Sequence, residues 1–199
     1  MLPYNDGGFY YHANVFEKIS KYNKIKTVFE VGSWFGKSTR HFAGLIESSG
    51  KVYAIDHWMG SPEHNIQSSQ YQKIYEQFLS NVIHKKLEDK IVPVKLSSQI
   101  AAIKLGKLNH KPDLIYIDAS HDFENVYNDL KAWYPFVRKK GILCGDDLSW
   151  EGVRKAVILF ALENNLILTE ISHHFEENVG AHIWFLESDN NRINNLNLI

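Results

Sequence analysis

Three aspartates follow two apolar segments of the chain, and carboxylates placed in this way could bind a cation or move a proton. Asp118 ends the apolar run that begins at Leu114, and Asp146 and Asp147 follow the apolar run that ends at Cys144. If the two runs are neighbouring strands, the carboxylates meet at one sheet edge and raise one another's pKa. Such a cluster usually has a compensating cation, and oxygen ligands favour Mg²⁺, Mn²⁺ or Ca²⁺. We expect Asp118, Asp146 and Asp147 to be metal ligands, unless Asp147 only caps a helix or Asp118 is a structural acid.

His121 is the candidate catalytic base. It stands three residues after Asp118, beside the expected metal ligands. An imidazole with the ordinary pKa of about 6.5 is neutral at pH 7 and can accept a proton. We therefore expect His121 and Asp118 to be catalytic, unless His121 only donates to Asp118 or to a backbone carbonyl. Two further acids nearby, Asp122 and Asp129, are expected to be solvated charges on a helix face.

A loop that contains Gly32 and Gly36 follows the apolar run at residues 27–31. It lacks the middle glycine of a dinucleotide fingerprint, and it is one residue shorter than a phosphate-binding loop. The two glycines also suit a tight turn that brings the backbone close to a ligand without a phosphate. A tight strand-to-helix turn with no ligand is the fourth interpretation.

The next apolar run ends in Asp56, which stands 24 residues after Gly32. An acid at this place can accept two hydrogen bonds from ribose hydroxyls, and it can also simply cap a turn. His57 and Trp58 follow it. Trp58 would stack near an adenine, line an acceptor pocket or lie at the surface.

The hydrophobic pattern predicts the elements that position these residues. We expect strands at residues 27–31, 51–55, 91–94, 114–117, 141–144, 167–172 and 182–186. Helices are expected at 38–48, 68–86, 98–105, 125–137 and 152–164, and Pro93 favours a sheet edge for the third strand. The alternation predicts an α/β fold with a doubly wound, mostly parallel sheet. Ligands of such sheets bind beyond the carboxyl ends of the strands, where the residues above lie.

The motif E-x-G-x-x-x-G-x-S beginning at Glu30, with Asp56 on the next strand, resembles class I S-adenosylmethionine-dependent methyltransferases. Ser98 and Gln99 are similar to the G-x-S-Q motif of small catechol-type O-methyltransferases, and Leu96 departs from it. The resemblance implies a Rossmann-like sheet of order 3-2-1-4-5-7-6 and S-adenosyl-L-methionine as the cofactor, with its ammonium held by Glu30. The implied cofactor-binding residues are Glu30, Gly32, Ser33, Gly36, Ser38, Asp56, His57, Trp58, Ser97, Ser98 and Asp118.

The stretch from Ile117 to Asp147 resembles a D-x-x-H…D-D pattern of the macrocin O-methyltransferase group, with Lys140 where a glycine is common. The resemblance spans residues 26–186. It implies methyl transfer to a hydroxyl of a small molecule, a sugar or another polyol, by in-line displacement at the sulfonium methyl. The metal would chelate the acceptor and lower its hydroxyl pKa. The alternatives are a nucleotide-dependent phosphotransferase and a methyltransferase-fold protein that binds a ligand without catalysis.

Length and composition limit the other classes of protein. The 199 residues fit one methyltransferase domain, with an expected N-terminal helical cap at 1–23, a core at 24–187 and a frayed tail at 188–199. The net charge of −1 predicts no general attraction to nucleic acid or to an anionic membrane. The longest apolar run, 156–162, falls short of the roughly 20 residues of a membrane span, and the chain opens without a signal-peptide pattern. We expect a cytoplasmic protein with Cys144 as a buried thiol, and a homo-oligomer is left open.

Overall fold

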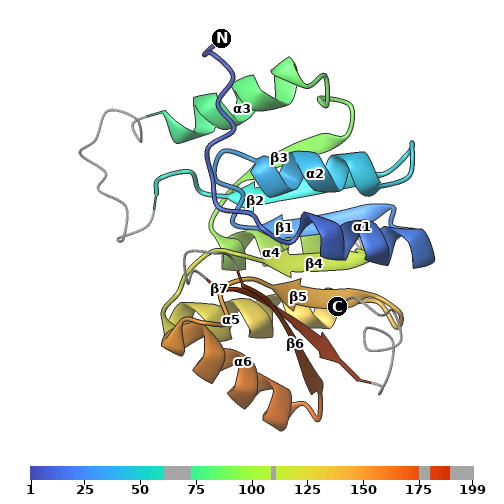
Figure 1. Ribbon diagram of the computed structural model, residues 1–199, viewed down its shortest axis with the longest axis vertical. Helices are drawn as coiled ribbons and strands as arrows, with labels where there is room; N and C mark the ends of the chain where they lie inside the picture. Colours follow the sequence, from blue (N-terminus) through green and yellow to red (C-terminus); the bar gives the residue numbers. More distant parts are fainter. Residues whose placement is uncertain (61–72, 109–110, 175–179, 189–199) are drawn as a thin grey trace.

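The computed structural model describes residues 1–60, 73–108, 111–174 and 180–188. Seven strands within these ranges form one sheet in the order β3-β2-β1-β4-β5-β7-β6, which confirms the expected topology (Figure 1). The first five strands pair in parallel, and β7 runs antiparallel to both β5 and β6. The strands are β1 (Thr27–Val31), β2 (Lys51–Asp56), β3 (Ile91–Lys95), β4 (Leu114–Ile117), β5 (Ile142–Gly145), β6 (Ile167–His174) and β7 (Gly180–Glu187).

Helices cover both faces of the sheet. One hydrophobic cluster joins the sheet to the first three helices, and a second cluster joins its other face to the last three. In Figure 1, α5 and α6 lie side by side in the lower part of the molecule, next to β7 and β6. The helices are α1 (Ala13–Tyr22), α2 (Lys37–Leu45), α3 (Ile74–His84), α4 (Ser98–Lys107), α5 (Phe123–Trp133) and α6 (Glu151–Glu163).

Alternating residues of the central strands build the two clusters. Val28 and Leu114 face the first cluster, whereas Phe29 and Ile115 face the second, and all four are fully or almost fully buried. Short strands that are apolar on both faces are typical of a parallel sheet covered by helices. Burying such apolar side chains stabilises the fold by roughly 25 cal/mol for each Å² of apolar surface removed from water.

Most predicted elements are present, with shifted ends. β3 lies at an edge of the sheet, as Pro93 predicts. The predicted helix 125–137 begins earlier because the Asp122 side chain accepts a hydrogen bond from the Asn125 N–H and caps α5. It ends earlier because a 3₁₀ turn follows at Tyr134–Phe136. Residues 68–72 of the predicted helix 68–86 lie outside the described residues.

The N-terminal segment is helical only in part. α1 occupies Ala13–Tyr22, and residues 1–12 instead run along α3 and α2 without a helix (Figure 1). The Asn81 side chain of α3 bonds both the N–H and the carbonyl of Asn5, and Arg40 of α2 pairs with Asp6 at 2.6 Å. The segment is therefore fastened to two helices before α1 begins.

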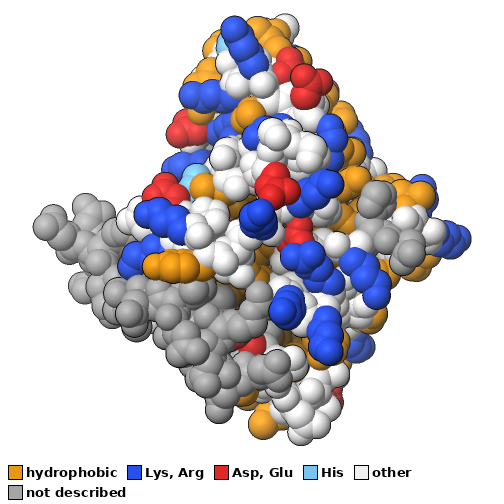
Figure 2. Space-filling model, turned by 90° about the vertical axis from the view of Figure 1, so that its right-hand side faces the viewer, with side chains coloured by type: hydrophobic (Ala, Val, Ile, Leu, Met, Phe, Trp, Pro, Cys, Tyr) orange, Lys and Arg blue, Asp and Glu red, His pale blue; other side chains and the backbone are white. Residues whose placement is uncertain are grey.

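The surface mixes charges of both signs. Figure 2 views the molecule from the right of Figure 1, and its lysine and arginine side chains outnumber the acidic ones across the middle of that face. Cys144 is buried, as the sequence predicts. Among the described residues, no helix has both the length and the apolar character that a membrane crossing requires.

Candidate active site

The loop between β1 and α2 depends on glycine at two positions. Gly32 has φ +91°, and a Cβ there would lie 1.8 Å from the Asp118 carbonyl oxygen. Gly36 has φ +79°, and a Cβ there would lie 2.8 Å from the Phe78 ring. Residues with a side chain rarely adopt such φ values, so only glycine lets the loop pass this close to the residue after β4 and to α3.

Glu30 lies beneath this loop and is completely buried. Its Oε2 accepts hydrogen bonds from the hydroxyls of Ser33, at 2.7 Å, and Thr39. Burial raises the pKa of Glu30 from 4.5 to about 7, and the hydroxyls of Ser38, Thr39 and Ser33 oppose that rise. Its Oε1 has no hydrogen-bond partner among the described residues. A buried carboxylate oxygen without a donor is an acceptor suited to a cationic group.

Asp56 connects the first loop to the second. Its Oδ2 accepts from the backbone N–H groups of Ser33 at 3.0 Å and Trp34 at 2.9 Å, and its Oδ1 accepts from Trp58 N at 2.6 Å. A carboxylate has about four acceptor positions and three are occupied here, so one remains on Oδ1 for a further donor such as a ribose hydroxyl.

Trp58 lies behind these loops. It is only 5% exposed, packs against Tyr75 and Phe78, and donates from Nε1 to the Trp34 carbonyl at 2.8 Å. The surface interpretation of Trp58 is therefore wrong. The neighbouring His57 side chain is half exposed, and its Nδ1 accepts from the Met59 N–H at 2.9 Å.

A partly buried group of polar side chains contacts the start of α4. Ser97 is the N-cap residue without a side-chain cap bond, and Ser98 accepts from Trp133 Nε1 at 2.8 Å. Gln99 donates to Asp129 at 2.7 Å. Asp129 is 3% exposed, and burial raises its pKa from 3.8 to about 6. The prediction of a solvated Asp129 is wrong, because helical spacing alone did not reveal that α4 covers this face of α5.

Asp146 is almost fully buried at the end of β5, where three donors reach its carboxylate. Its Oδ1 contacts His12 Nε2 and the Asp147 N–H, both at 2.8 Å, and its Oδ2 accepts from the Tyr116 hydroxyl at 3.0 Å. His12 is fully buried and was missed by the sequence analysis. No local pattern marks it, because its partner stands 134 residues away.

Asp147 and His121 form a pair beside Asp146. The Asp147 backbone has φ +61°, and its Oδ2 lies 2.9 Å from His121 Nε2. The His121 ring stacks on Trp150, with ring centroids 4.5 Å apart and an interplanar angle of 14°. The partner of His121 Nε2 is therefore Asp147, and not Asp118 or a backbone carbonyl.

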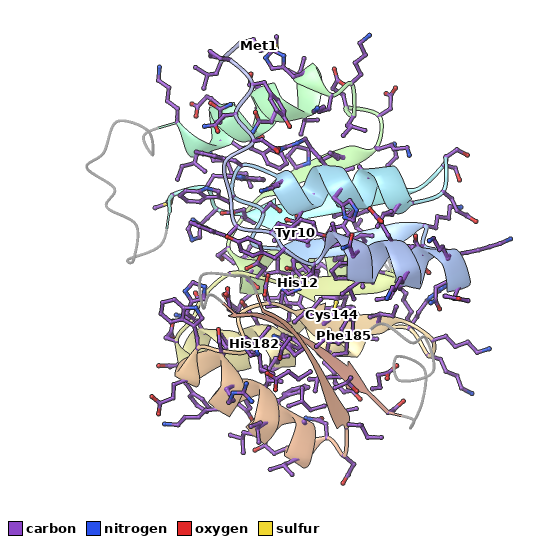
Figure 3. All side chains as sticks on the ribbon, in the orientation of Figure 1. Met1, Tyr10, His12, Cys144, His182 and Phe185 are labelled. Carbon is purple, nitrogen blue, oxygen red and sulfur yellow. The ribbon has the colours of Figure 1, made fainter. Side chains whose placement is uncertain are left out.

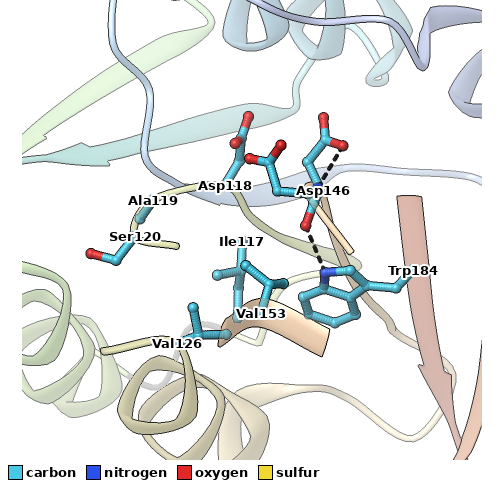
Figure 4. A pocket seen from close by; sticks show the side chains of 9 residues that line it. Ile117, Asp118, Ala119, Ser120, Val126, Asp146, Val153 and Trp184 are labelled. Carbon is cyan, nitrogen blue, oxygen red and sulfur yellow. Dashed lines mark hydrogen bonds between the residues drawn. The ribbon is translucent and has the colours of Figure 1, made fainter. Parts of the chain in front are cut away.

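Asp118 and Asp146 face one pocket at the ends of β4 and β5 (Figure 4). Burial and the nearby charges of Asp146 and Asp147 raise the pKa of Asp118 well above its usual value. The pocket is lined by Ile117, Asp118, Ala119, Ser120, Val126, Asp146, Asp147, Val153 and Trp184. The clustering of carboxylates predicted from the sequence is therefore present.

The predicted metal site does not fit this arrangement. In residues 1–60, 73–108, 111–174 and 180–188, no group of three His, Cys, Asp or Glu side chains could hold a metal ion. His12 and Tyr116 bond the carboxylate of Asp146, and His121 bonds that of Asp147. The expected Mg²⁺ or Mn²⁺ at Asp118, Asp146 and Asp147 finds no support here.

Known proteins share this fold. Residues 29–148, more than half of the chain, match a family model described as a methyltransferase domain. An O-methyltransferase from Bacillus cereus in complex with SAH is 18% identical with a TM-score of 0.67, over 88% of this chain and 78% of that one. Cofactor-bound Rv0187 from MTB is 17% identical with a TM-score of 0.71, over 94% of this chain and 85% of that one. TomG from Streptomyces achromogenes, an O-methyltransferase involved in tomaymycin synthesis and in complex with SAM, is 13% identical with a TM-score of 0.61, over 88% and 78%.

The strand order and the glycine loop at the carboxyl edge of the sheet define a class I methyltransferase. The chain belongs to the methyltransferase domain family whose model it matches. No curated protein sequence matches it.

Proposed function

We propose that the protein transfers a methyl group from S-adenosylmethionine to a hydroxyl of a small molecule, a sugar or another polyol. The observation that carries the proposal is the arrangement of the loop after β1: Gly32 lets it pass against the Asp118 carbonyl, and Ser33 bonds both the buried Glu30 and Asp56 at the end of β2. Such a site lies where doubly wound sheets bind their ligands. The SAH and SAM held by structural neighbours support the choice of cofactor.

The residues around the loops divide into contacts for different parts of the cofactor. Asp56 would accept from a ribose hydroxyl with its remaining acceptor position, and Glu30 Oε1 would accept from the methionine ammonium. The backbone of Gly32 to Gly36 and the Ser38 hydroxyl would also contact the methionine part of the cofactor. The residues at the ends of β2 and β3, namely His57, Trp58, Ser97 and Ser98, would border the adenine. The bound cofactor supplies an electrophilic methyl group.

Proton removal from the acceptor hydroxyl falls to the His121–Asp147 pair in this proposal. If His121 Nε2 donates to the Asp147 carboxylate, Nδ1 is the nitrogen that accepts a proton, and Asp147 stabilises the resulting imidazolium. Asp118 lines the pocket, and its raised pKa makes it the second candidate acceptor. The acid limb of the kcat profile should disappear in His121→Asn under the first assignment and in Asp118→Asn under the second.

Metal assistance is not part of this proposal. The carboxylates of Asp146 and Asp147 already bond His12, Tyr116 and His121, so we derive no step through a cation. The acidic edge instead binds and orients the acceptor by hydrogen bonds. Positioning the oxygen in line with the methyl group is itself a large contribution to catalysis.

Calorimetry tests the cofactor first. S-adenosylhomocysteine is expected to bind, whereas ATP and NAD are not. Tight ATP binding without a response to S-adenosylhomocysteine would point to the phosphotransferase that the short glycine loop also suggested. Candidate sugars and polyols are then assayed by transfer of a labelled methyl group, and binding without turnover on any acceptor would favour a non-catalytic protein.

A further inference from the structure

The N-terminal segment reaches into the site through His12. Figure 3 shows Tyr10 and His12 on the stretch of chain that leads into α1. The His12 side chain is fully buried, and its Nε2 lies 2.8 Å from Asp146 Oδ1. A carboxylate only accepts hydrogen bonds, so His12 Nε2 is the donor.

The contacts continue from His12 to the candidate base. The same Asp146 Oδ1 accepts from the Asp147 N–H, and Asp147 holds His121 with its own carboxylate. Asp147 has φ +61°, a left-handed conformation that is uncommon for a non-glycine residue, although Asp adopts it more readily than most, and local hydrogen bonds help to hold it. The Asp146 carboxylate makes such a bond to the Asp147 N–H, and it is itself held by His12 at Oδ1 and by Tyr116 at Oδ2.

The contact is not required for the helix that His12 precedes. His12 is the N-cap residue of α1, yet its side chain makes no cap bond to that helix. The segment also has its own anchors, since Asn5 bonds Asn81 and the Tyr10 hydroxyl lies 2.8 Å from His41 Nδ1. These anchors bring the imidazole to Asp146, while the hydrogen bonds of Asn5 and Tyr10 go to Asn81 and His41 and not to Asp146 or Asp147.

We propose that His12 is a positioning residue of the methyl-transfer site. Through Asp146 it holds the Asp147 backbone in the geometry that orients Asp147 toward His121. The expected effect on kcat rests on the proposed function, whereas the expected effect on the position of the Asp147–His121 pair does not. Loss of the His12 donor should misplace the pair while the cofactor loop, which lies at β1 and β2, stays intact.

The experiment compares His12→Leu with His12→Gln, because a Gln side-chain amide can donate from nearly the same place and Leu cannot. Tyr10→Phe is the matched control, since it removes a hydrogen bond of the same segment outside the pathway. His12→Leu should lower kcat by roughly 10- to 100-fold, the range expected when a reacting group is displaced by about 1 Å. The Kd of S-adenosylhomocysteine should stay within about twofold in all variants, since the cofactor contacts are untouched. His12→Gln should recover most of kcat, and Tyr10→Phe should retain it.

A spectroscopic measurement keeps the test independent of turnover. The ring-nitrogen NMR signals of His121 should move in His12→Leu and stay near their wild-type positions in His12→Gln and Tyr10→Phe. Unchanged His121 signals in His12→Leu, or equal losses of kcat in the Leu and Gln variants, would overturn the positioning role. A wild-type protein that binds no S-adenosylhomocysteine would refute the proposed function, and the His121 signals would still decide the role of His12.

Discussion

Replacing Glu30 by Gln should change how the stability of the protein depends on pH. Burial raises the pKa of Glu30 from 4.5 to about 7 in the folded protein. Between these values the folded state holds a proton that the unfolded state has lost. The contribution of Glu30 to stability is therefore fully present below pH 4.5 and is lost as the pH rises through 7. At about 1.4 kcal/mol per pKa unit, the loss amounts to about 3 kcal/mol.

Urea denaturation of wild type and Glu30→Gln between pH 5 and pH 8 measures this loss. The wild-type free energy of unfolding should fall, relative to the variant, by roughly 2.5 kcal/mol across that range, because Gln does not titrate and the rest of the loss lies below pH 5. Other buried acids, such as Asp129, titrate in both proteins and cancel in the difference. The exposed Glu47→Gln is the control and should run parallel to wild type. A constant difference between wild type and Glu30→Gln would refute the reasoning.

The same substitution tests the proposed ammonium contact. A cation bound at Glu30 favours the ionised carboxylate, so S-adenosylhomocysteine should displace a proton when it binds near pH 6.5. Calorimetry in two buffers of different ionisation enthalpy detects that proton. Glu30→Gln should bind without releasing it, and proton release that persists in the variant would move the contact to another group.

Three further predictions concern the loops and the acidic edge. Gly32→Ala should abolish S-adenosylhomocysteine binding and lower Tm, because its Cβ would lie 1.8 Å from the Asp118 carbonyl oxygen. Asp56→Ala should weaken that binding by roughly 1–3 kcal/mol in calorimetry, because it leaves buried donors without their acceptor; an unchanged Kd would reject the ribose contact. Turnover should survive exhaustive chelation, because the carboxylates after β5 are bonded to side chains; activity lost to chelator and restored by Mg²⁺ or Mn²⁺ would show a metal site after all.

Local chemistry made most of the fold predictable. Strands such as β1 and β4 are short apolar runs, and their predicted bounds of 27–31 and 114–117 agree with the structure. Pro93 lacks a backbone donor, which explains its place on the edge strand β3. The order of the strands required the family resemblance, because the hydrophobic pattern specifies alternation and not neighbours.

The site residues that could be predicted are those that stand at the ends of predictable strands. Glu30, Asp56 and Asp118 each stand at the end of a strand or one residue from it, so the parallel sheet places them at the same edge. The partner of Asp146 was not predictable, because His12 lies in a segment without periodicity and the contact spans 134 residues. The metal expectation failed to find support for the same reason: counting carboxylates omitted the side chains that bond them.

The contact between His12 and Asp146 also limits when the chain can complete its site during synthesis. His12 and the apolar face of α1 leave the ribosome before β4 and β5, on which they pack, have been made. Contacts between residues far apart in sequence form late, because a long loop has to close first. A nascent chain that ends before β5 therefore exposes the buried residues Val15, Phe16 and Ile19 of α1. We expect such chains to be cleaved by protease near α1, and full-length chains to be protected there.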